Sequence, residues 1–466
     1  GKTMVEKTLH QMRLGGVFDH IGLGFHRYST DKRWFLPHFE KMLYDQAMIS
    51  MAFLEAYQIT NNENYANVAR EIFTYVLRDM RDKDGGFYSA EDADSEGEEG
   101  IFYIWTQEEL VKILGEDDGL KLAKTFGFID GGNFFEEAGG HTTGNNIPYF
   151  QDDRETLAKN VDMSLDDFNA FIEKSREKLF KVREKRIHPL KDDKILTDWN
   201  GLMIAALSQG GQVLGDEVYI DAAKNAVKFV LESLRDDNGR LMKRSRLGKA
   251  GLQPHLDDYS FMVFGLLNLY EATFDPSYLA SALELTEIMM ADFSDKNGGF
   301  FIGSKDAEKL MVRAKDSYDG AIPSGNSVAA LNLFRLGKIT GNTKWTDLGY
   351  STLKAFTDKA KQSPTGFAHM LTAFMFDFKN PKEVVLVGDS NDPETQKTIS
   401  AIRKNYSPNK VILFKDVSNP DALLQVAPWT KDHVMINGSP TFYVCENFAC
   451  KQPTTSLDLA MKYMNE

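Results

Sequence analysis

Residues 198–241 read DWNGLMIAALSQGGQVLGDEVYIDAAKNAVKFVLESLRDDNGRL, and this stretch decides the fold. Its first part, 198–214, is apolar nearly all round, as a fully buried helix is. Its second part, 218–234, carries a single apolar stripe at helical spacing and a polar outer side. The Asn-Gly turn that follows, before apolar residues, is a short hairpin signal. The stretch therefore predicts a buried helix, an outer helix and a small hairpin.

The same unit recurs along the chain. Further buried helices are expected at 39–57, 258–273, 323–336 and 367–378, and further striped helices at 64–80, 276–293 and 343–360. Turns at 84–88 and 297–301 resemble the one at 238–241. The turns at 238–241 and 297–301 are about 59 residues apart, and so are the buried-helix starts at Asp198 and Asp257. A self-similar step of this size indicates stacked helical hairpins. We favour a mainly α fold, an (α/α)6 toroid whose inner helices surround a funnel, over an open solenoid.

The pattern also predicts how the chain is divided. The toroid is expected over 1–380, with an insertion at about 106–186 that does not fit the repeat. Residues 1–14 already resemble a helix without a partner, so the first inner helix is expected to be missing and the chain to be a fragment. Residues 381–466 change character to strand, helix, strand, then another strand and a last helix, which predicts a small C-terminal α/β region.

Composition excludes several classes of function. The 54 Lys and Arg against 68 Asp and Glu give a net charge of −14, which opposes a nucleic-acid role and docking on anionic membranes. Neither a long apolar run nor a signal-peptide pattern is present, so a cytoplasmic protein is expected. Two cysteines suit a reducing compartment, and Cys445-x4-Cys450 is neither a redox C-x-x-C pair nor a zinc signature, so structural cysteines are expected. No dinucleotide, P-loop or metal motif predicts a cofactor or metal.

The starts of the buried helices share polar and aromatic residues. In a toroid these starts meet at one mouth of the funnel, where Asp and Ser also cap helix N-termini. Capping explains one polar group per helix but not the aromatic and amide groups at the same level, so a shared ligand site is favoured. The candidates are Asp198, Trp199, Asn200, His255, Asp257, Asp258, Tyr259, Asp319, Ser324, Asn326 and His369.

Residues 15–46 gather acid–base and anion-binding groups among glycines and aromatics. Such loops commonly line a pocket, although bracing of a packed loop is the alternative. The candidates here are His20, His26, Arg27, His38, Glu40 and Tyr44. Asp92 and Asp94 begin like a calcium loop, but Tyr103 stands where the bidentate Glu is needed. A solvated turn and a sugar-binding turn are equally open readings of that run.

Five long motifs resemble a known family: Gly16–Ser29, Pro37–Gln46, Gly86–Gly100, Asp198–Leu202 and Asp319–Leu331. They are similar to the thioredoxin-domain-containing family of spermatogenesis-associated protein 20, and the resemblance includes the Cys445–Cys450 tail. It implies a thioredoxin-like front domain, absent from this chain, joined to a six-hairpin toroid similar to glycoside hydrolases and N-acylglucosamine 2-epimerases. The missing front segment is a possible partner.

Two classes of function follow from these patterns. The first is a carbohydrate-active enzyme, which as a glycosidase needs two carboxyls and as a sugar epimerase or isomerase needs two bases. Its candidate catalytic residues are His38, Asp198, His255, Asp257, Asp258 and His369, with a sugar or glycan as partner. The second is a non-catalytic toroid that binds a glycan or protein and accompanies a thioredoxin-like domain.

Overall fold

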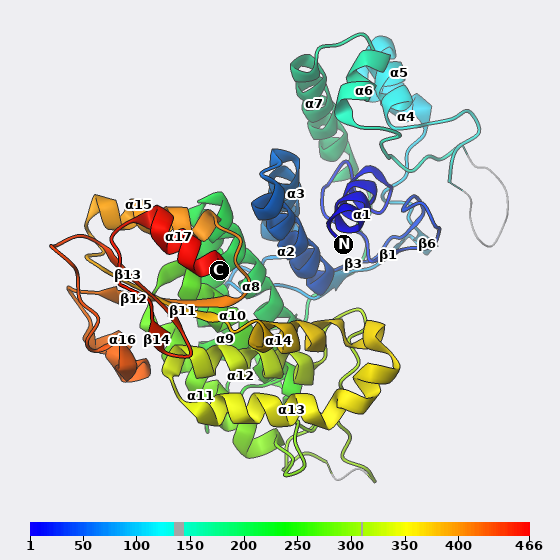
Figure 1. Ribbon diagram of the computed structural model, residues 1–466. Helices are drawn as coiled ribbons and strands as arrows, with labels where there is room; N and C mark the ends of the chain where they lie inside the picture. The colour runs from blue at the N-terminus through cyan, green and yellow to red at the C-terminus, as the bar shows by residue number, and fades with distance from the viewer. Residues whose placement is uncertain (135–143, 309–310) are drawn as a thin grey trace. The chain divides into compact units, whose positions relative to one another are not determined.

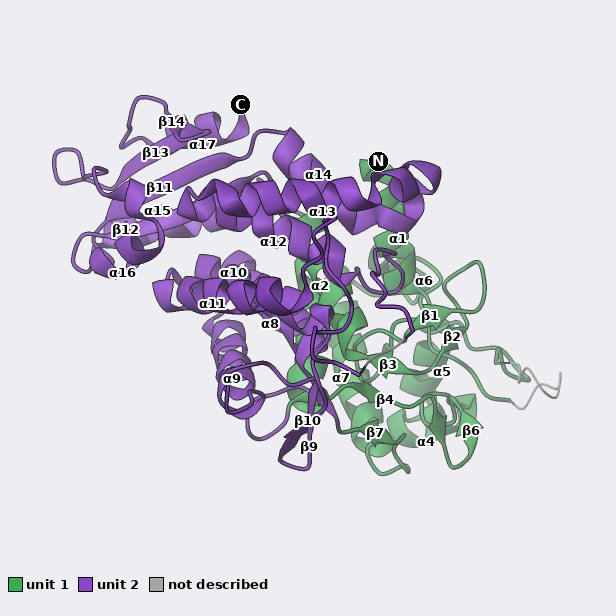
Figure 2. Ribbon diagram, turned by 90° about the horizontal axis from the view of Figure 1, so that it is seen from below, with its two compact units in different colours: residues 1–56, 62–81, 88–193 green, residues 57–61, 82–87, 194–466 purple. Residues whose placement is uncertain are grey.

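The computed structural model describes residues 1–134, 144–308 and 311–466 (Figure 1). The chain forms two compact units (Figure 2). Unit 1 comprises residues 1–56, 62–81 and 88–193, and unit 2 comprises 57–61, 82–87 and 194–466. Each unit is described by itself.

Unit 2 is built from the predicted helical hairpins. Its buried helices are α8 (Thr197–Leu214), α10 (Leu256–Thr273), α12 (Gly325–Thr340) and α14 (Ala368–Phe378), the last preceded by a 3-10 turn (Pro364–Phe367). Its outer helices are α9 (Glu217–Ser233), α11 (Pro276–Phe293) and α13 (Thr343–Gln362). Each buried helix packs on the next, in the order α8, α10, α12, α14, and each of the first three packs on the outer helix that follows it. The predicted fold class, mainly α with toroid-type hairpins and a small C-terminal α/β region, is confirmed.

Local chemistry sets where the outer helices begin. Asp216, Asp275 and Asn342 each cap a helix by accepting a hydrogen bond from a backbone N–H of its first turn. Gly215 and Gly341 end the preceding inner helices in the left-handed conformation, which glycine adopts without strain. These paired stop and start signals turn the chain back on itself within a few residues.

The inner helices α8 and α10 approach each other through glycine. A Cβ atom at Gly201 would lie 2.4 Å from the backbone carbon of Phe261, and one at Gly265 would lie 2.7 Å from the Gly201 carbonyl oxygen. Only a residue without a side chain permits this spacing. The glycines therefore bring the polar N-termini of the two helices close together.

The C-terminal region is a four-stranded sheet in the order β12-β11-β13-β14. The strands are β11 (Lys382–Gly388), β12 (Lys410–Asp416), β13 (Thr441–Glu446) and β14 (Ala449–Cys450), with helices α15 (Pro393–Lys404), α16 (Asp421–Val426) and α17 (Leu457–Asn465) and a 3-10 turn (Pro428–Thr430). Strands β11 and β12 are parallel and joined by α15, whereas β13 runs antiparallel to β11.

This sheet is part of unit 2. Trp429 Nε1 donates to the Ile339 carbonyl at 2.8 Å, and Lys338 Nζ lies 3.0 Å from the buried Glu383 carboxylate. The α/β region is thus bonded to the end of α12, and the two segments form one compact body.

Unit 1 contains the predicted helices at its start and in the insertion. They are α1 (Lys2–Leu14), α2 (Leu43–Thr60, whose last residues belong to unit 2), α3 (Glu63–Tyr75) continued by a π-helix (Val76–Met80), α4 (Gln107–Leu114), α5 (Glu116–Thr125), α6 (Arg154–Asn160) and α7 (Leu165–Arg183). Short strands connect them: β1 (Tyr28–Ser29), β2 (Pro37–His38), β3 (Lys41–Met42), β4 (Ala90–Glu91), β5 (Asp94–Ser95), β6 (Glu98–Glu99) and β7 (Lys191–Asp192). In unit 2 the corresponding short strands are β8 (Ile195–Leu196), β9 (Arg244–Arg246) and β10 (Lys249–Gly251).

The apolar core of the predicted insertion is shared with the start of the chain. Trp105, Leu122, Phe126, Phe168 and Leu179 are all fully buried in it, together with Ile21, and Leu14 packs against it. Residues 135–143, which belong to the same stretch of sequence, lie outside the described residues. Among the described residues, no helix is long and apolar enough to cross a membrane.

A buried ion cluster ties the 15–46 segment to α7. The carboxylate of Asp19 accepts hydrogen bonds from the two terminal guanidinium nitrogens of Arg183, each at 2.9 Å, and from Lys41 Nζ at 2.8 Å. Burial opposes ionisation of Asp19, but Arg183 and Lys41 outweigh it and hold its pKa well below the usual value. The aspartate is therefore ionised and structural.

Candidate functional site

The polar side chains at or near the N-termini of the inner helices in unit 2, together with Lys243 before β9, are here called the inner-helix rim: Asp198, Lys243, Asp257, Asp258, Asp319, Ser324 and His369. Its centre is an ionic triad. Lys243 Nζ, just before β9, lies 2.5 Å from Asp198 Oδ2 and 3.2 Å from Asp258 Oδ1. Sequence reasoning missed Lys243, because it lies in a run of charged residues with nothing to distinguish it.

Asp258 is the structural member of this triad. Its side chain is fully buried and accepts the backbone N–H of His255 at 2.7 Å and that of Asp198 at 3.2 Å. Burial and the neighbouring Asp198 raise its pKa. In turn the two carboxylates raise the pKa of Lys243 against the effect of its own burial, so the lysine stays charged.

Asp257 is the titratable group of the rim. Its half-buried side chain belongs to the first turn of α10, and burial, with the charge of Asp198, raises its pKa to about 6. The Gly325 N–H at the start of α12 hydrogen-bonds it. A Cβ at Gly325 would lie only 2.2 Å from Asp257 Oδ1, so the glycine admits this carboxyl between α10 and α12. A carboxyl with a pKa near 6 can donate or accept a proton near neutral pH.

Asp319 and His369 extend the rim to α14. Asp319 accepts the N–H of Ser324 at 2.9 Å and those of His369 and Met370 at 2.8 and 3.1 Å. Ser324 itself caps α12. Asp319 and Ser324 therefore both act as helix caps.

The His369 imidazole is the remaining candidate base of the rim. Its Nε2 is buried and has no hydrogen-bond partner among the described residues. Burial lowers its pKa, so it is neutral at neutral pH and able to accept a proton.

Three predicted binding residues brace the hairpins instead. The Asn200 amide bonds both backbone groups of Phe87, the Asn326 amide bonds both of Phe300, and the Tyr259 hydroxyl accepts the N–H of Leu241 at 3.0 Å. All three side chains are fully buried. Near the start of each of α8, α10 and α12, one side chain thus holds a small hairpin that the repeat predicted, which accounts for the polar atoms of these three residues.

Replacing Asn326 by alanine is expected to destabilise the fold by ~1–3 kcal/mol, because the Phe300 N–H and C=O would be left buried without partners. Urea unfolding followed by circular dichroism measures this. The matched control is Asn297→Ala in the exposed turn of the same hairpin, which should change stability by less than ~0.5 kcal/mol. Equal effects of the two substitutions would contradict the bracing role.

Trp199 and His255 flank the triad. Trp199 is half-buried, and its backbone N–H donates to Asp198 at 2.9 Å. His255 is exposed, and partial burial together with Lys243 lowers its pKa. The two side chains border the rim on the α8 and α10 side.

Unit 1 carries a second polar cluster, built on β1, β2 and the start of α2. Arg27 bonds Glu40 at 2.8 Å and the Tyr44 hydroxyl at 3.1 Å, while His38 Nδ1 lies 2.7 Å from Glu99 Oε1 and its Nε2 3.5 Å from Glu40. The predicted candidates Arg27, His38, Glu40 and Tyr44 are thus brought together.

Asp45, another of the acid–base groups that the sequence gathers in residues 15–46, adjoins this cluster. Its Oδ2 is buried without a described hydrogen-bond partner. Burial raises its pKa to about 8, with Arg27 opposing and Glu40 adding to the shift. Like Asp198 and Asp257, it lies in the first turn of a helix that is apolar nearly all round.

The other predicted residues of unit 1 have different hydrogen-bond partners, although Asp94 on β5 pairs with Glu99 on β6. His20 and His26 are buried and bond the carbonyls of Gly15 and Phe39; burial, with Arg13 or Lys41 adding to it, lowers the pKa of each to about 3. Both imidazoles are neutral and serve packing. Asp92 and Asp94 are exposed at a small hairpin, where the Asp94 N–H bonds Asp92 at 3.4 Å.

The chain is similar in sequence to spermatogenesis-associated protein 20 of three mammals. The human protein is 37% identical over 97% of this chain and the mouse protein 35% identical over the same share. Over the region that it spans, the chain belongs to the spermatogenesis-associated protein 20 family. It covers 61% of the human member's length. An uncharacterized Caenorhabditis elegans protein is 31% identical, with 99% of this chain and 66% of that protein covered. No family model matches the chain.

Solved structures similar to this family member are sugar-processing enzymes. Cellobiose 2-epimerase from Spirochaeta thermophila aligns with a TM-score of 0.46 at 10% identity, covering 99% of this chain and 98% of that one. D-mannose isomerase aligns with a TM-score of 0.36 at 15% identity, covering 77% and 87%. A GH76 α-mannanase from Bacteroides thetaiotaomicron gives 0.30 at 13% identity, covering 67% and 73%.

Proposed function

We propose that this chain is a carbohydrate-active enzyme whose ligand site is the inner-helix rim of unit 2. The observation that carries the proposal is Asp257: a half-buried carboxyl whose pKa of about 6 suits proton transfer, next to the ionic Asp198–Lys243 pair. An acidic rim repels anionic ligands, whereas its carboxylates can accept hydrogen bonds from the hydroxyls of a neutral sugar.

The contacts favour isomerisation or epimerisation over glycoside hydrolysis. A glycosidase needs two available carboxyls. Asp198 and Asp258 both bind Lys243, and Asp319 caps α12 and α14, so their oxygens are already engaged. Among the described rim residues, Asp257 and the neutral His369 remain able to move a proton, and His255 beside the rim is a further base. Removal of a proton from the carbon next to a sugar carbonyl, and its return, is the chemistry that such groups support.

The test is a panel of neutral mono- and disaccharides. A ligand at 100 times its Kd should stabilise the protein by about 2.7 kcal/mol, seen as a rise in Tm. Each sugar that binds is then incubated with the protein in D₂O and followed by proton NMR. Isomerisation or epimerisation replaces a carbon-bound proton by deuterium, whereas hydrolysis releases a free sugar without this exchange.

Two other outcomes would count against the proposal. A sugar that binds without turnover would favour the non-catalytic toroid that accompanies a thioredoxin-like domain. If the panel neither stabilises the protein nor reacts, the rim is not a carbohydrate site. Repeating the panel on a protein of the full length of the human relative separates a missing domain from a missing activity.

A further inference from the structure

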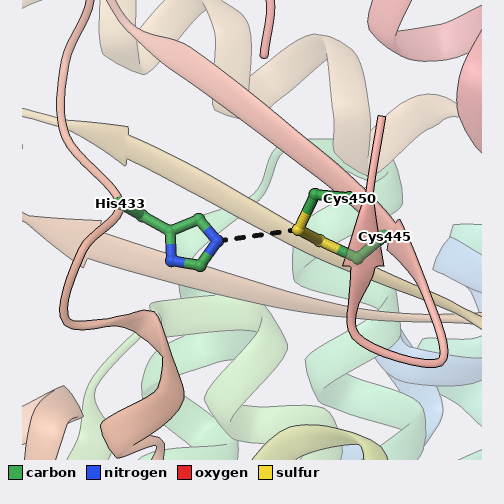
Figure 3. Close-up of side chains that lie close together, drawn as sticks. All are labelled: His433, Cys445 and Cys450. Carbon is green, nitrogen blue, oxygen red and sulfur yellow. Dashed lines mark hydrogen bonds between the residues drawn. A yellow bond between two sulfur atoms is a disulfide. The ribbon is translucent and has the colours of Figure 1, made fainter. Parts of the chain in front are cut away.

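The C-terminal sheet of unit 2 ends in a disulfide beside a histidine (Figure 3). Cys445 on β13 and Cys450 on β14 are directly opposite in the antiparallel ladder. Cys445 is buried, whereas Cys450 is exposed. His433 Nε2 lies 3.8 Å from the Cys450 sulfur. The proposed sugar site does not involve these residues.

This disulfide adds little stability to the β13–β14 hairpin, whose strands are already paired. The ladder pairs Cys445 with Cys450 and Glu446 with Ala449, so the two cysteines are neighbours without the covalent bond. The bond closes a loop with only four residues between the cysteines, and the stabilisation from cross-linking is smallest for the shortest loops. The pair is therefore poorly suited to act only as a staple.

His433 is fixed against the exposed sulfur. The backbone N–H of His433 donates to the Thr430 carbonyl at 3.1 Å, and Lys415 Nζ donates to the His433 carbonyl at 2.8 Å. The His433 ring packs edge-on against the Tyr443 ring, with 4.2 Å between the ring centroids. Its Nδ1 is buried without a described partner. Burial, with the charge of Lys415, lowers its pKa against the opposing effects of a hydrogen bond to the Thr430 backbone and of Asp432, so the imidazole is neutral and can accept a proton.

A hollow of about 370 Å³ opens beside the disulfide. Its lining includes Asp432, His433, Tyr443, Cys450 and Gln452. Both the exposed sulfur and the imidazole border this hollow, so a small molecule in it can reach the two groups that an exchange reaction requires.

We propose that Cys445–Cys450 is a thiol–disulfide exchange site for a low-molecular-weight thiol. The incoming thiol gives its proton to His433 Nε2, and its sulfur attacks the Cys450 sulfur. The Cys445–Cys450 bond breaks with its electron pair on Cys445, which takes the proton from His433. The products are a mixed disulfide on Cys450 and a free thiol at Cys445. A second thiol that attacks the mixed disulfide leaves two protein thiols and an oxidised small disulfide.

The test exposes the full chain to reduced glutathione and follows the product by intact and peptide mass spectrometry. The mixed disulfide should form on Cys450, and His433→Gln should slow its formation at least ~10-fold, as loss of a proton-transfer group does. His10→Gln, at the exposed face of α1, is the matched control and should keep the wild-type rate. Cys445→Ser tests the exposed thiol separately: it should form the same adduct with oxidised glutathione.

Several results would overturn the proposal. They are a disulfide that resists millimolar glutathione, an adduct on Cys445 instead of Cys450, or equal rates for His433→Gln and wild type. Stoichiometric Zn²⁺ uptake by the reduced protein that blocks the adduct would assign the three side chains to a metal site instead, since their ligand atoms lie within 4.8 Å of one another. Circular dichroism of each variant shows whether the fold is retained.

Discussion

Replacing Asp257 by asparagine is expected to lower turnover of the sugar identified by the panel by ~10²–10⁴-fold, the range lost with a general acid–base group. Asparagine has nearly the same shape and can still meet the Gly325 N–H that bonds the carboxyl. It cannot exchange a proton. The loss should therefore appear in kcat, with Tm little changed.

The direction in which kcat/KM changes with pH shows whether Asp257 acts as an acid or as a base. Burial raises the pKa of Asp257 to about 6, so the carboxyl is protonated below that pH and ionised above it. If it acts as the acid, kcat/KM falls as pH rises through about 6; if it acts as the base, kcat/KM rises over the same interval. In either role the step centred near pH 6 should be absent from Asp257→Asn.

Asp237→Asn is the matched control for this experiment. Asp237 is exposed in a turn of the same unit, and its replacement should leave both turnover and the pH profile unchanged. Wild-type turnover in Asp257→Asn, or loss of turnover in both variants, would remove Asp257 from the mechanism.

The helical repeat was predictable because each buried helix has a recognisable apolar pattern in its own stretch of sequence. The expected helix at 276–293 agrees with α11 (Pro276–Phe293), and that at 198–214 agrees with α8 within one residue. Apolar periodicity is a property of neighbouring residues and is legible in one sequence. The helical pattern over residues 105–126 instead divides at Gly115 into α4 and α5, since this glycine adopts a positive φ.

The site was less predictable because its contacts join distant residues. Asn200 and Asn326 were candidates for ligand binding, yet their amides meet hairpin backbone 113 and 26 residues away. The partnership of Lys243 with Asp198 spans 45 residues. A residue type at a helix start indicates a polar position, but its partner depends on which loop the fold brings there.

The buried Asp19 cluster leads to the last large effect. Asp19→Asn should reduce the free energy of unfolding by ~3–5 kcal/mol at neutral pH, because Arg183 would keep its charge without a buried anion and Lys41, whose pKa burial already lowers, would lose its counter-ion. Their contacts with Asp19 are 2.8–2.9 Å long, and all three side chains are almost fully buried. Urea unfolding measures the loss.

Lowering the pH should reduce the difference in the free energy of unfolding between wild type and Asp19→Asn. Arg183 and Lys41, against the opposing effect of burial, hold the pKa of Asp19 below its unfolded value. The stability from its ionisation is thus present above the unfolded pKa of ~3.9 and is lost as pH falls through the folded pKa. Glu173→Gln, which breaks an exposed pair with Arg176, is the control and should cost less than ~1 kcal/mol. If both substitutions cost the same at neutral pH, the buried cluster does not hold the 15–46 segment to α7.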